Sequence, residues 1–369
     1  RSGLETALKD SKVDLIRATA RFTGKRTIKA GDRELTANTI IINTGTSPSI
    51  PQIAGLGAAT PLHNQNVFDL EKLPGELLVL GGGYIGLELG QGFARLGSKV
   101  TIIDRHERPM SREDEDVGHA LLAAFRDDNI VFHANCELQM VSVKVDRLEC
   151  LLSNNIRIVV DRILIAAGRT PNTDALNCAV AGIELDKRGN VKVDDQFRTS
   201  ADGVYAVGDV IGQPAFTHVS WEDHRRLMGI LTGDDQSSRT SGQKARRRQD
   251  QPLAYACFTD PQVARIGLSK SEAEKKGIKV RAARSDVSGM ARAKEFGHEH
   301  GFFEIVADAQ SEKILGATLV GYETAELIHV FIDLIALGAT WRDLEQRMHI
   351  HPTYGEQLPG LARKLMSDS

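Results

Sequence analysis

The amino-acid sequence predicts an α/β protein with doubly wound, parallel-sheet domains and a C-terminal α+β domain. The first observation is a strand–glycine loop–helix–strand unit over residues 77–103, which implies a parallel sheet. The second is that further short apolar strands end at glycines, over residues 162–168 and 203–209. The third is a change after Pro252, where short strands follow one another with few crossover helices, as in an antiparallel sheet.

In the N-terminal part we expect short strands and turns over the first 60 residues. Residues 39–43 are a β-branched run that suits a strand buried on both faces, and turn-forming residues follow it. In the glycine-loop unit, the strand over residues 77–80 leads into a helix with an apolar stripe at Ile85, Leu89, Phe93 and Leu96. Gly97 is placed to end that helix.

The remaining elements follow from the same patterns. Further along we expect a helix over about 115–128 and a strand over 130–132, and an apolar helix over 325–337 precedes a helical C-terminal end. The antiparallel strands are expected at 254–258, 263–267, 279–283, 302–307 and 314–320. Residues 237–251 are polar and contain a short basic run, which we interpret as a solvated interdomain linker rather than a nucleic-acid-binding segment.

Composition limits the classes of function. The 369 residues suggest two to three domains at roughly 150 residues each. The net charge is 46 − 49 = −3, which provides no basic field for nucleic acid or an anionic membrane. No run of about 18 apolar residues and no signal-peptide core occurs, so we expect a cytoplasmic protein. The four cysteines form no zinc or dithiol motif, and we expect buried thiols and no metal site.

The glycine loop predicts dinucleotide binding. Gly81-Gly82-Gly83-Tyr84-Ile85-Gly86 follows a strand and opens a helix, and Asp104 ends the next strand. Gly81 permits the tight turn, Gly83 lets a pyrophosphate approach the backbone, and Gly86 allows close helix–strand packing. The helix N-terminus offers free N–H groups and a partial positive charge to the phosphates. The alternative is a tight glycine turn in an unrelated α/β sheet.

Asp104 bears on the choice of dinucleotide. Its carboxylate can accept hydrogen bonds from the adenosine ribose, whereas a 2′-phosphate would meet a like charge there. NAD is therefore favoured over NADP. Arg105 and Arg108 follow closely, and either could pair with a phosphate, so NADP stays open.

Five motifs occur in order along nearly the whole chain. They are Thr44-Gly45-Thr46-Ser47-Pro48, the glycine loop continued to Leu87-Glu88, Ala167-Gly168-Arg169-Thr170-Pro171-Asn172, Val207-Gly208-Asp209-Val210 and His351-Pro352-Thr353-Tyr354-Gly355-Glu356. With these motifs the chain resembles the class I pyridine nucleotide–disulfide oxidoreductases, which include dihydrolipoamide dehydrogenase, glutathione reductase and mercuric reductase. Residues 109–114 and 216–220 look closest to the mercuric-reductase-like branch, which includes the copper-linked reductases of reactive-chlorine resistance.

The resemblance implies an FAD-containing homodimer that passes electrons from NAD(P)H through flavin to a cysteine pair and on to a small-molecule oxidant. It implies that residues 1–60 and 170–250 belong to the FAD-binding domain, 61–169 to the NAD(P)-binding domain and 251–369 to the dimer interface. The residues implied to bind FAD are Thr44, Gly45, Thr46, Arg169, Gly208, Asp209, Phe216, Thr217 and His218. Those implied to contact NAD(P), besides the loop and Asp104, are Leu138 and Gly168, through their backbone.

Several of these residues have ordinary structural alternatives. Gly208-Asp209 is also typical of a surface turn, Tyr84 of packing at a helix start, and Arg169 of a solvated side chain. In the family, the residue matching Tyr84 lies over the flavin and moves aside for nicotinamide. The acid matching Glu88 pairs there with a lysine beside the redox cysteines, a residue that would precede Arg1.

His351 and Glu356 match the family's catalytic pair. Imidazole exchanges protons near neutral pH, and a carboxylate behind it fixes the tautomer and stabilises the charged ring. In the family this pair reaches the partner subunit's cysteines, so the dimer forms the active site. The mercuric reductases depart from the His-Pro pattern and end in a vicinal cysteine pair, so mercury reduction is not expected here.

The family's first FAD-binding unit, with its own glycine motif and the CxxxxC redox pair, is not in this sequence. We therefore expect the chain to begin roughly 90 residues into the family pattern and to be an incomplete form. Two alternatives stay open: a non-catalytic nucleotide-binding and dimerising remnant, and a diaphorase-like flavin reductase without dithiol chemistry. The sequence upstream of Arg1 would discriminate among them.

Overall fold

The computed structural model describes residues 2–233 and 252–366. The chain divides into two compact units, and each unit consists of two separate stretches of the sequence. Unit 1 comprises residues 1–47 and 169–250, and unit 2 comprises residues 48–168 and 251–369. The linker predicted over 237–251 lies outside the described residues.

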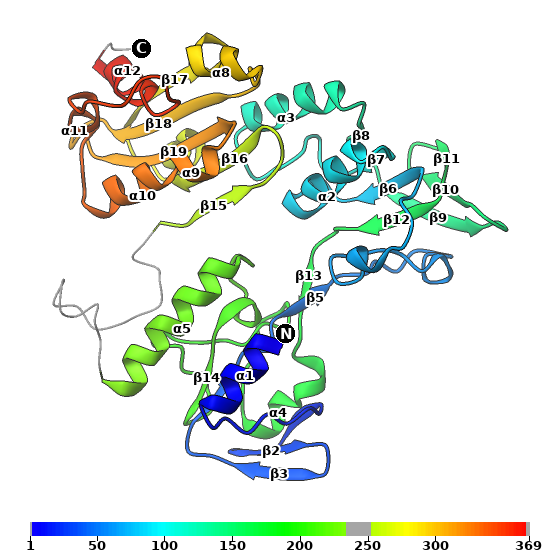
Figure 1. The fold of residues 1–369 in the computed structure, drawn as a ribbon. Coiled ribbons are helices and arrows are strands. Elements are labelled where there is room, and N and C mark those ends of the chain that lie inside the picture. The colour runs from blue at the N-terminus through cyan, green and yellow to red at the C-terminus, as the bar shows by residue number, and fades with distance from the viewer. Residues whose placement is uncertain (1, 234–251, 367–369) are drawn as a thin grey trace. The chain divides into compact units, whose positions relative to one another are not determined.

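Unit 1 is built on short strands and two longer helices (Figure 1). β4 pairs in parallel with β14, and β1, β2 and β3 form an antiparallel sheet. A buried apolar cluster that includes Phe22, Phe197 and Val204 forms its core. The elements are α1 (Ser2–Asp10), β1 (Ala20–Gly24), β2 (Thr27–Ala30), β3 (Arg33–Thr36), β4 (Ile40–Ile42), β13 (Arg169–Pro171), α4 (Cys178–Ala181), β14 (Val204–Ala206) and α5 (Thr217–Thr232).

Two expectations for this unit are wrong. The chain begins with helix α1 rather than with strands, and the acidic Glu5 in its first turn and Lys9 in its last suit the helix dipole. The strand over residues 40–42 is not buried on both faces, because Ile41 is 46% exposed. Successive side chains of a strand face opposite sides, and the apolar cluster lies only on the side of Ile40 and Ile42.

The first part of unit 2 confirms the predicted βαβ unit. A parallel sheet with strand order β12-β6-β7-β8 carries α2 and α3 between its strands, and an antiparallel sheet of order β11-β10-β9 follows. β5 (Thr46–Pro48), whose first two residues belong to unit 1, pairs with β13 of that unit. The elements of this part of unit 2 are β6 (Glu76–Leu80), α2 (Tyr84–Arg95), β7 (Lys99–Ile103), α3 (Glu115–Asp127), β8 (Val131–His133), β9 (Leu138–Val143), β10 (Leu148–Leu152), β11 (Arg157–Val160) and β12 (Arg162–Ile165).

The second part of unit 2 is an antiparallel sheet with strand order β15-β16-β19-β18-β17, as expected for an α+β domain (Figure 1). Helices pack on the sheet around buried Phe303, Phe331 and Trp341. The elements are β15 (Ala254–Cys257), β16 (Gln262–Gly267), α7 (Lys270–Lys275), β17 (Val280–Asp286), α8 (Ala291–Phe296), β18 (Phe302–Asp308), β19 (Ile314–Gly321), α9 (Thr324–Leu327), α10 (His329–Ala336), α11 (Trp341–Glu345) and α12 (Gln357–Arg363).

The single helix expected over 325–337 is two consecutive short helices, α9 and α10, that meet at buried Ile328. Leu337 lies beyond the second one and is 82% exposed, because Gly338 turns the chain with a positive φ. Across residues 2–233 and 252–366, none of the helices combines the length and the apolar character needed to cross a membrane.

Candidate functional site

The glycine loop joins β6 to α2 with the geometry that the sequence predicts. Gly81 has a φ of 115°, and a Cβ on it would lie 2.5 Å from the carbonyl oxygen of Ala166. A Cβ on Gly86 would lie 2.0 Å from the carbonyl oxygen of Gly81, so this glycine lets α2 start against the strand. Gly83 has nothing within 4 Å of its Cβ position, so the loop is open where a phosphate would approach.

Asp104, directly after β7, lies against this loop. Its Oδ2 accepts a hydrogen bond from the backbone N–H of Gly82. Its Oδ1 accepts one from the backbone N–H of His106 at 2.7 Å and lies 2.6 Å from the ring Nδ1 of His106. The carboxylate is thereby held at the mouth of the loop. Sequence analysis missed His106. Its position two residues after Asp104 could have indicated that its backbone N–H and its ring contact the carboxylate.

The two arginines near Asp104 differ in their contacts. Arg105 is exposed at the surface. Arg108 is paired with Glu107 and also donates to the carbonyl oxygen of Glu113, so its guanidinium already has anionic and carbonyl partners.

The other residues expected to contact NAD(P) lie in the same unit. Leu138 is buried at the start of β9, and Gly168 has a φ of 121° with open space at its Cβ position. Tyr84 and Ile85 begin α2 and are half-buried.

Glu88 lies one turn beyond Tyr84 on α2. Its Oε1 accepts a hydrogen bond of 2.8 Å from the backbone N–H of Phe258, just after β15. Burial raises the pKa of the Glu88 carboxyl, against the lowering effect of the Phe258 N–H and the Cys257 thiol. Sequence analysis missed Phe258, whose side chain is 66% exposed beside this acid. The acid therefore has a partner next to the antiparallel sheet β15-β16-β19-β18-β17 of unit 2.

In unit 1 the structure brings three distant motifs together. The Thr46 hydroxyl donates to the Asp209 Oδ2 at 3.2 Å, and Arg169 donates to the Thr46 hydroxyl at 2.6 Å and to its carbonyl oxygen at 2.8 Å. Arg169 and Asp209 lie 3.9 Å apart and are each about a fifth exposed. Thr44 is tied to Asn172 by two hydrogen bonds of 2.9 and 2.8 Å.

The glycines of these motifs have two different roles. At Gly208 a side chain would clash with neighbouring atoms, whereas at Gly45 the space beside the backbone is open. A Cβ on Gly208 would lie 2.7 Å from both the Asn43 Oδ1 and the Ser220 Oγ, so the turn that presents Asp209 requires glycine. Gly45 has a φ of 65° and open space at its Cβ position. The carboxylate of Asp209 thus stands partly exposed near the C-terminal end of β14, beside open backbone.

Phe216, Thr217 and His218 form the start of α5. Thr217 is its first residue, and Phe216 precedes it with an extended backbone. The rings of Phe216 and His218 stack with centroids 5.5 Å apart. Two flat side chains therefore stand side by side at a helix N-terminus in unit 1.

His351 and Glu356 are brought together as the sequence predicts. The ring Nδ1 of His351 lies 2.6 Å from the Glu356 Oε2, and the His351 side chain is 74% exposed whereas that of Glu356 is 15% exposed. The Thr353 hydroxyl accepts from the backbone N–H of Glu356 at 3.2 Å and donates to the carbonyl oxygen of Ile350 at 2.6 Å. A half-buried carboxylate therefore orients an exposed imidazole.

The four cysteines are free and buried, as expected. Burial raises the pKa of the Cys257 thiol to about 12 and that of Cys150 to about 11, and it also raises the pKa of Cys178. Because the thiolate is the reactive form, these thiols are unsuited to disulfide exchange near neutral pH. Among the described residues, no group of His, Cys, Asp and Glu side chains is arranged to hold a metal ion.

A glycine loop of the dinucleotide-binding type, a histidine oriented by a carboxylate and an antiparallel C-terminal sheet thus occur together in this chain. The family described as "Pyridine nucleotide-disulphide oxidoreductase" matches residues 1–223, and its dimerisation domain matches residues 253–362. The chain belongs to this family of FAD- and NAD(P)H-dependent enzymes.

Curated relatives span several activities. The chain is 29% identical to the probable pyridine nucleotide-disulfide oxidoreductase RclA of Escherichia coli (strain K12), covering 95% of this chain and 78% of that protein. It is 32% identical to a mercuric reductase of Lysinibacillus sphaericus, covering 94% and 62% of the two. It is 32% identical to a dihydrolipoyl dehydrogenase of Thermus scotoductus, covering 98% and 77%.

Solved structures agree with the fold. The HOCl-induced flavoprotein disulfide reductase RclA from Escherichia coli matches with a TM-score of 0.90 and 28% identity, over 98% of this chain and 82% of that one. Its Cu(II) complex matches with a TM-score of 0.87 and 28% identity, over 95% and 79%. The predicted fold class, with its nucleotide-binding domains and C-terminal dimerisation domain, is confirmed.

Proposed function

We propose that the protein passes electrons from NAD(P)H through FAD to a disulfide or dithiol and on to a small-molecule oxidant, either a disulfide or a metal ion. The observation that carries this proposal is the His351–Glu356 pair, joined at 2.6 Å in a chain that also holds the glycine loop and Asp104. A dinucleotide-binding loop alone is compatible with many reactions. An exposed imidazole that is hydrogen-bonded to a carboxylate can in addition transfer protons to and from a substrate.

NAD is the preferred dinucleotide in this proposal. The phosphates would bind at the open Gly83 backbone and the N-terminus of α2, and the ribose hydroxyls would bind Asp104. A 2′-phosphate would meet the Asp104 carboxylate, and Arg108 is already engaged by Glu107 and Glu113. Arg105 is exposed, and its guanidinium is the group that could pair with the 2′-phosphate of NADP.

FAD would bind unit 1, within the domain that we assign to residues 1–60 and 170–250. The hydroxyl-rich ribityl chain would bind the partly exposed Asp209, and open backbone at Gly45 would lie beside it. Thr44, Thr46, Arg169 and Gly208 would complete the site, with Phe216, Thr217 and His218 beside the ring. When bound, FAD supplies a ring that accepts hydride from nicotinamide and reduces a disulfide.

His351 holds or releases a proton at its Nε2 in this reaction. Glu356 accepts the hydrogen bond of Nδ1–H and so fixes which ring nitrogen faces outward. The dithiol that it serves is not among the four cysteines of this chain, all of which are buried.

A homodimer would form through the domain that we assign to residues 251–369. We assign residues 61–169 to the NAD(P)-binding domain. The match to the family's dimerisation domain supports this assignment. Near His351, Met348 is 99% and Ile350 is 79% exposed, which suits a surface that a second subunit covers.

The test uses the purified full-length protein. We expect flavin absorbance near ~450 nm and oxidation of NADH coupled to a disulfide or metal-ion acceptor. His351→Gln should slow thiol-linked turnover by roughly 10²–10⁴-fold while flavin content stays unchanged. Absence of flavin and of NAD(P)H oxidation with every acceptor would refute the proposal.

A second candidate is a diaphorase-like flavin reductase that needs no dithiol. The burial of all four cysteines favours it. Such an enzyme would reduce a dye or quinone with NADH at the same rate before and after thiol alkylation. Loss of activity on alkylation would decide for the dithiol route.

A further inference from the structure

Helix α2 presents a row of polar side chains that includes more than the predicted Glu88. Glu88, Gln91 and Arg95 lie at positions i, i+3 and i+7 of the helix and therefore share one face. All three contact residues 258–260 in the segment that joins β15 to β16. Helix α2 is thereby joined to the segment that leads into the antiparallel sheet of the same unit.

Gln91 makes the most specific of these contacts. Its side chain is only 3% exposed, and its amide pairs with both backbone groups of Asp260. Its Oε1 accepts from the Asp260 N–H at 2.7 Å, and its Nε2 donates to the Asp260 carbonyl oxygen at 2.8 Å and to the Asp128 Oδ2 at 2.7 Å. Because an unpaired buried backbone group is costly, this arrangement tolerates little displacement.

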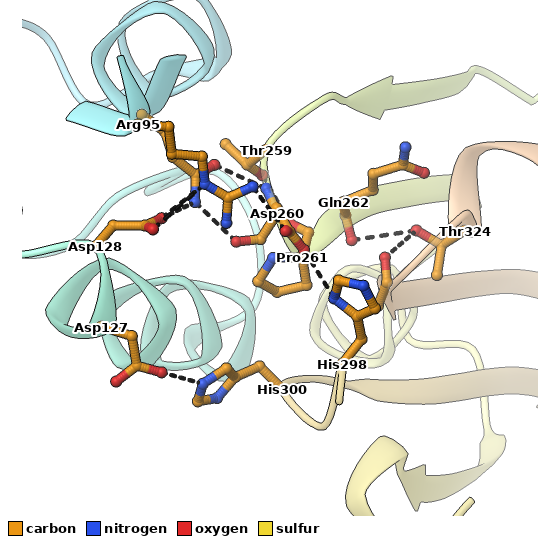
Figure 2. A network of polar contacts seen from close by, with 12 residues as sticks. Arg95, Asp127, Asp128, Thr259, Asp260, Pro261, Gln262, His298, His300 and Thr324 are labelled. Carbon is orange, nitrogen blue, oxygen red and sulfur yellow. Dashed lines mark hydrogen bonds and ion pairs between the residues drawn. The ribbon is translucent and has the colours of Figure 1, made fainter. Parts of the chain in front are cut away.

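The segment is held from its other side as well. Figure 2 shows Asp260 between Arg95 and His298, with its Oδ2 at 2.8 Å from Arg95 and its Oδ1 at 3.8 Å from His298. The Thr259 hydroxyl donates to the Pro261 carbonyl oxygen at 2.8 Å. These contacts fix the backbone of residues 258–261, including the N–H that Phe258 donates to Glu88.

We infer that Gln91 is a positioning residue for the nicotinamide end of the bound dinucleotide. The inference rests on the proposed function and on the family resemblance, which implies that Tyr84 moves aside for nicotinamide and that Glu88, one turn further along α2, lies near it. By holding residue 260, Gln91 sets where the Phe258 backbone meets the Glu88 carboxylate. In the proposed function the adenosine end binds separately, at the glycine loop and Asp104, whereas the hydrogen bonds of Gln91 go to Asp128 and Asp260.

The test compares two ligands that differ only at the nicotinamide end. Binding of NAD⁺, which does not reduce the flavin, and of ADP-ribose is measured by titration calorimetry on the full-length protein and on Gln91→Leu. We expect roughly tenfold weaker binding of NAD⁺, with ADP-ribose binding within about twofold of the unmodified protein. Arg95→Gln, which removes the ion pairs of Arg95 with Asp260 and Asp128 but leaves the hydrogen bonds of Gln91 to the Asp260 backbone, should show a smaller change in the same direction.

Arg284→Gln is the matched control, because Arg284 pairs with Asp116 between the same two parts of unit 2 yet does not contact residues 258–261. It should leave both affinities unchanged. Equal weakening of both ligands by Gln91→Leu and Arg95→Gln, or no weakening of NAD⁺ by either, overturns the inference. If the unmodified protein binds neither ligand, the proposed nucleotide site itself fails, and the inference with it.

Discussion

Alanine substitutions in the glycine loop separate a glycine that the fold requires from one that the nucleotide requires. In Gly86→Ala the new Cβ would lie 2.0 Å from the Gly81 carbonyl oxygen and 3.2 Å from the Ala166 Cβ. In Gly83→Ala the new Cβ would meet nothing within 4 Å, and the extended backbone there, with φ −86° and ψ 173°, accepts alanine. One change alters packing, and the other alters only the open face of the loop.

The magnitudes follow from these distances. A contact of 2.0 Å is far inside the ~3.5 Å at which non-bonded atoms attract, so α2 must shift, and overpacking of this kind costs about 1–3 kcal/mol. For a unit of this size, that lowers the melting temperature by roughly 2–10 °C. Gly83→Ala should leave stability unchanged or raise it by up to about 1 kcal/mol. Its methyl group should nevertheless weaken NAD⁺ binding at least roughly tenfold, by blocking the phosphates.

The assay is thermal melting together with NAD⁺ titration on each variant. Gly92→Ala is the matched control, since it lies in the same helix with open space at its Cβ position, and it should stabilise the helix by about 1 kcal/mol without affecting binding. Normal NAD⁺ binding by Gly83→Ala would refute the placement of the phosphates. An unchanged melting temperature of Gly86→Ala would refute the packing argument.

Three further predictions concern the rest of the chain. Arg265→Met leaves the Glu113 carboxylate, 6% exposed, without the cation now 2.8 Å away, so urea denaturation should show a loss of about 3–5 kcal/mol; a loss below about 1 kcal/mol would contradict it. Glu356→Gln should lower thiol-linked turnover without changing NAD⁺ affinity, and a change in affinity alone would argue against the proton-transfer role. Burial raises the pKa of Cys257 to about 12, so its contribution to stability is complete below about pH 9 and is lost as the pH rises towards 12; Cys257→Ala should flatten that part of the stability curve.

Much of the fold could be predicted because its signals are local. The glycine spacing between β6 and α2, the apolar strands and the alternation after Pro252 all depend on neighbours along the chain, and the structure confirms them. The errors arose where packing overrides local preference. Ile41 belongs to a β-branched run, yet it is exposed because the apolar cluster covers only one face of β4.

The sequence by itself therefore determined the fold class, the glycine loop and the pairing of His351 with Glu356, which lies only five residues further along. Only the tertiary structure decided which distant groups meet. Gln91 and Asp260 are 169 residues apart, and Arg265 and Glu113 are 152 apart. The physical reason is that a buried polar group needs a partner, but its residue type does not specify which distant segment the folded chain brings within hydrogen-bonding distance.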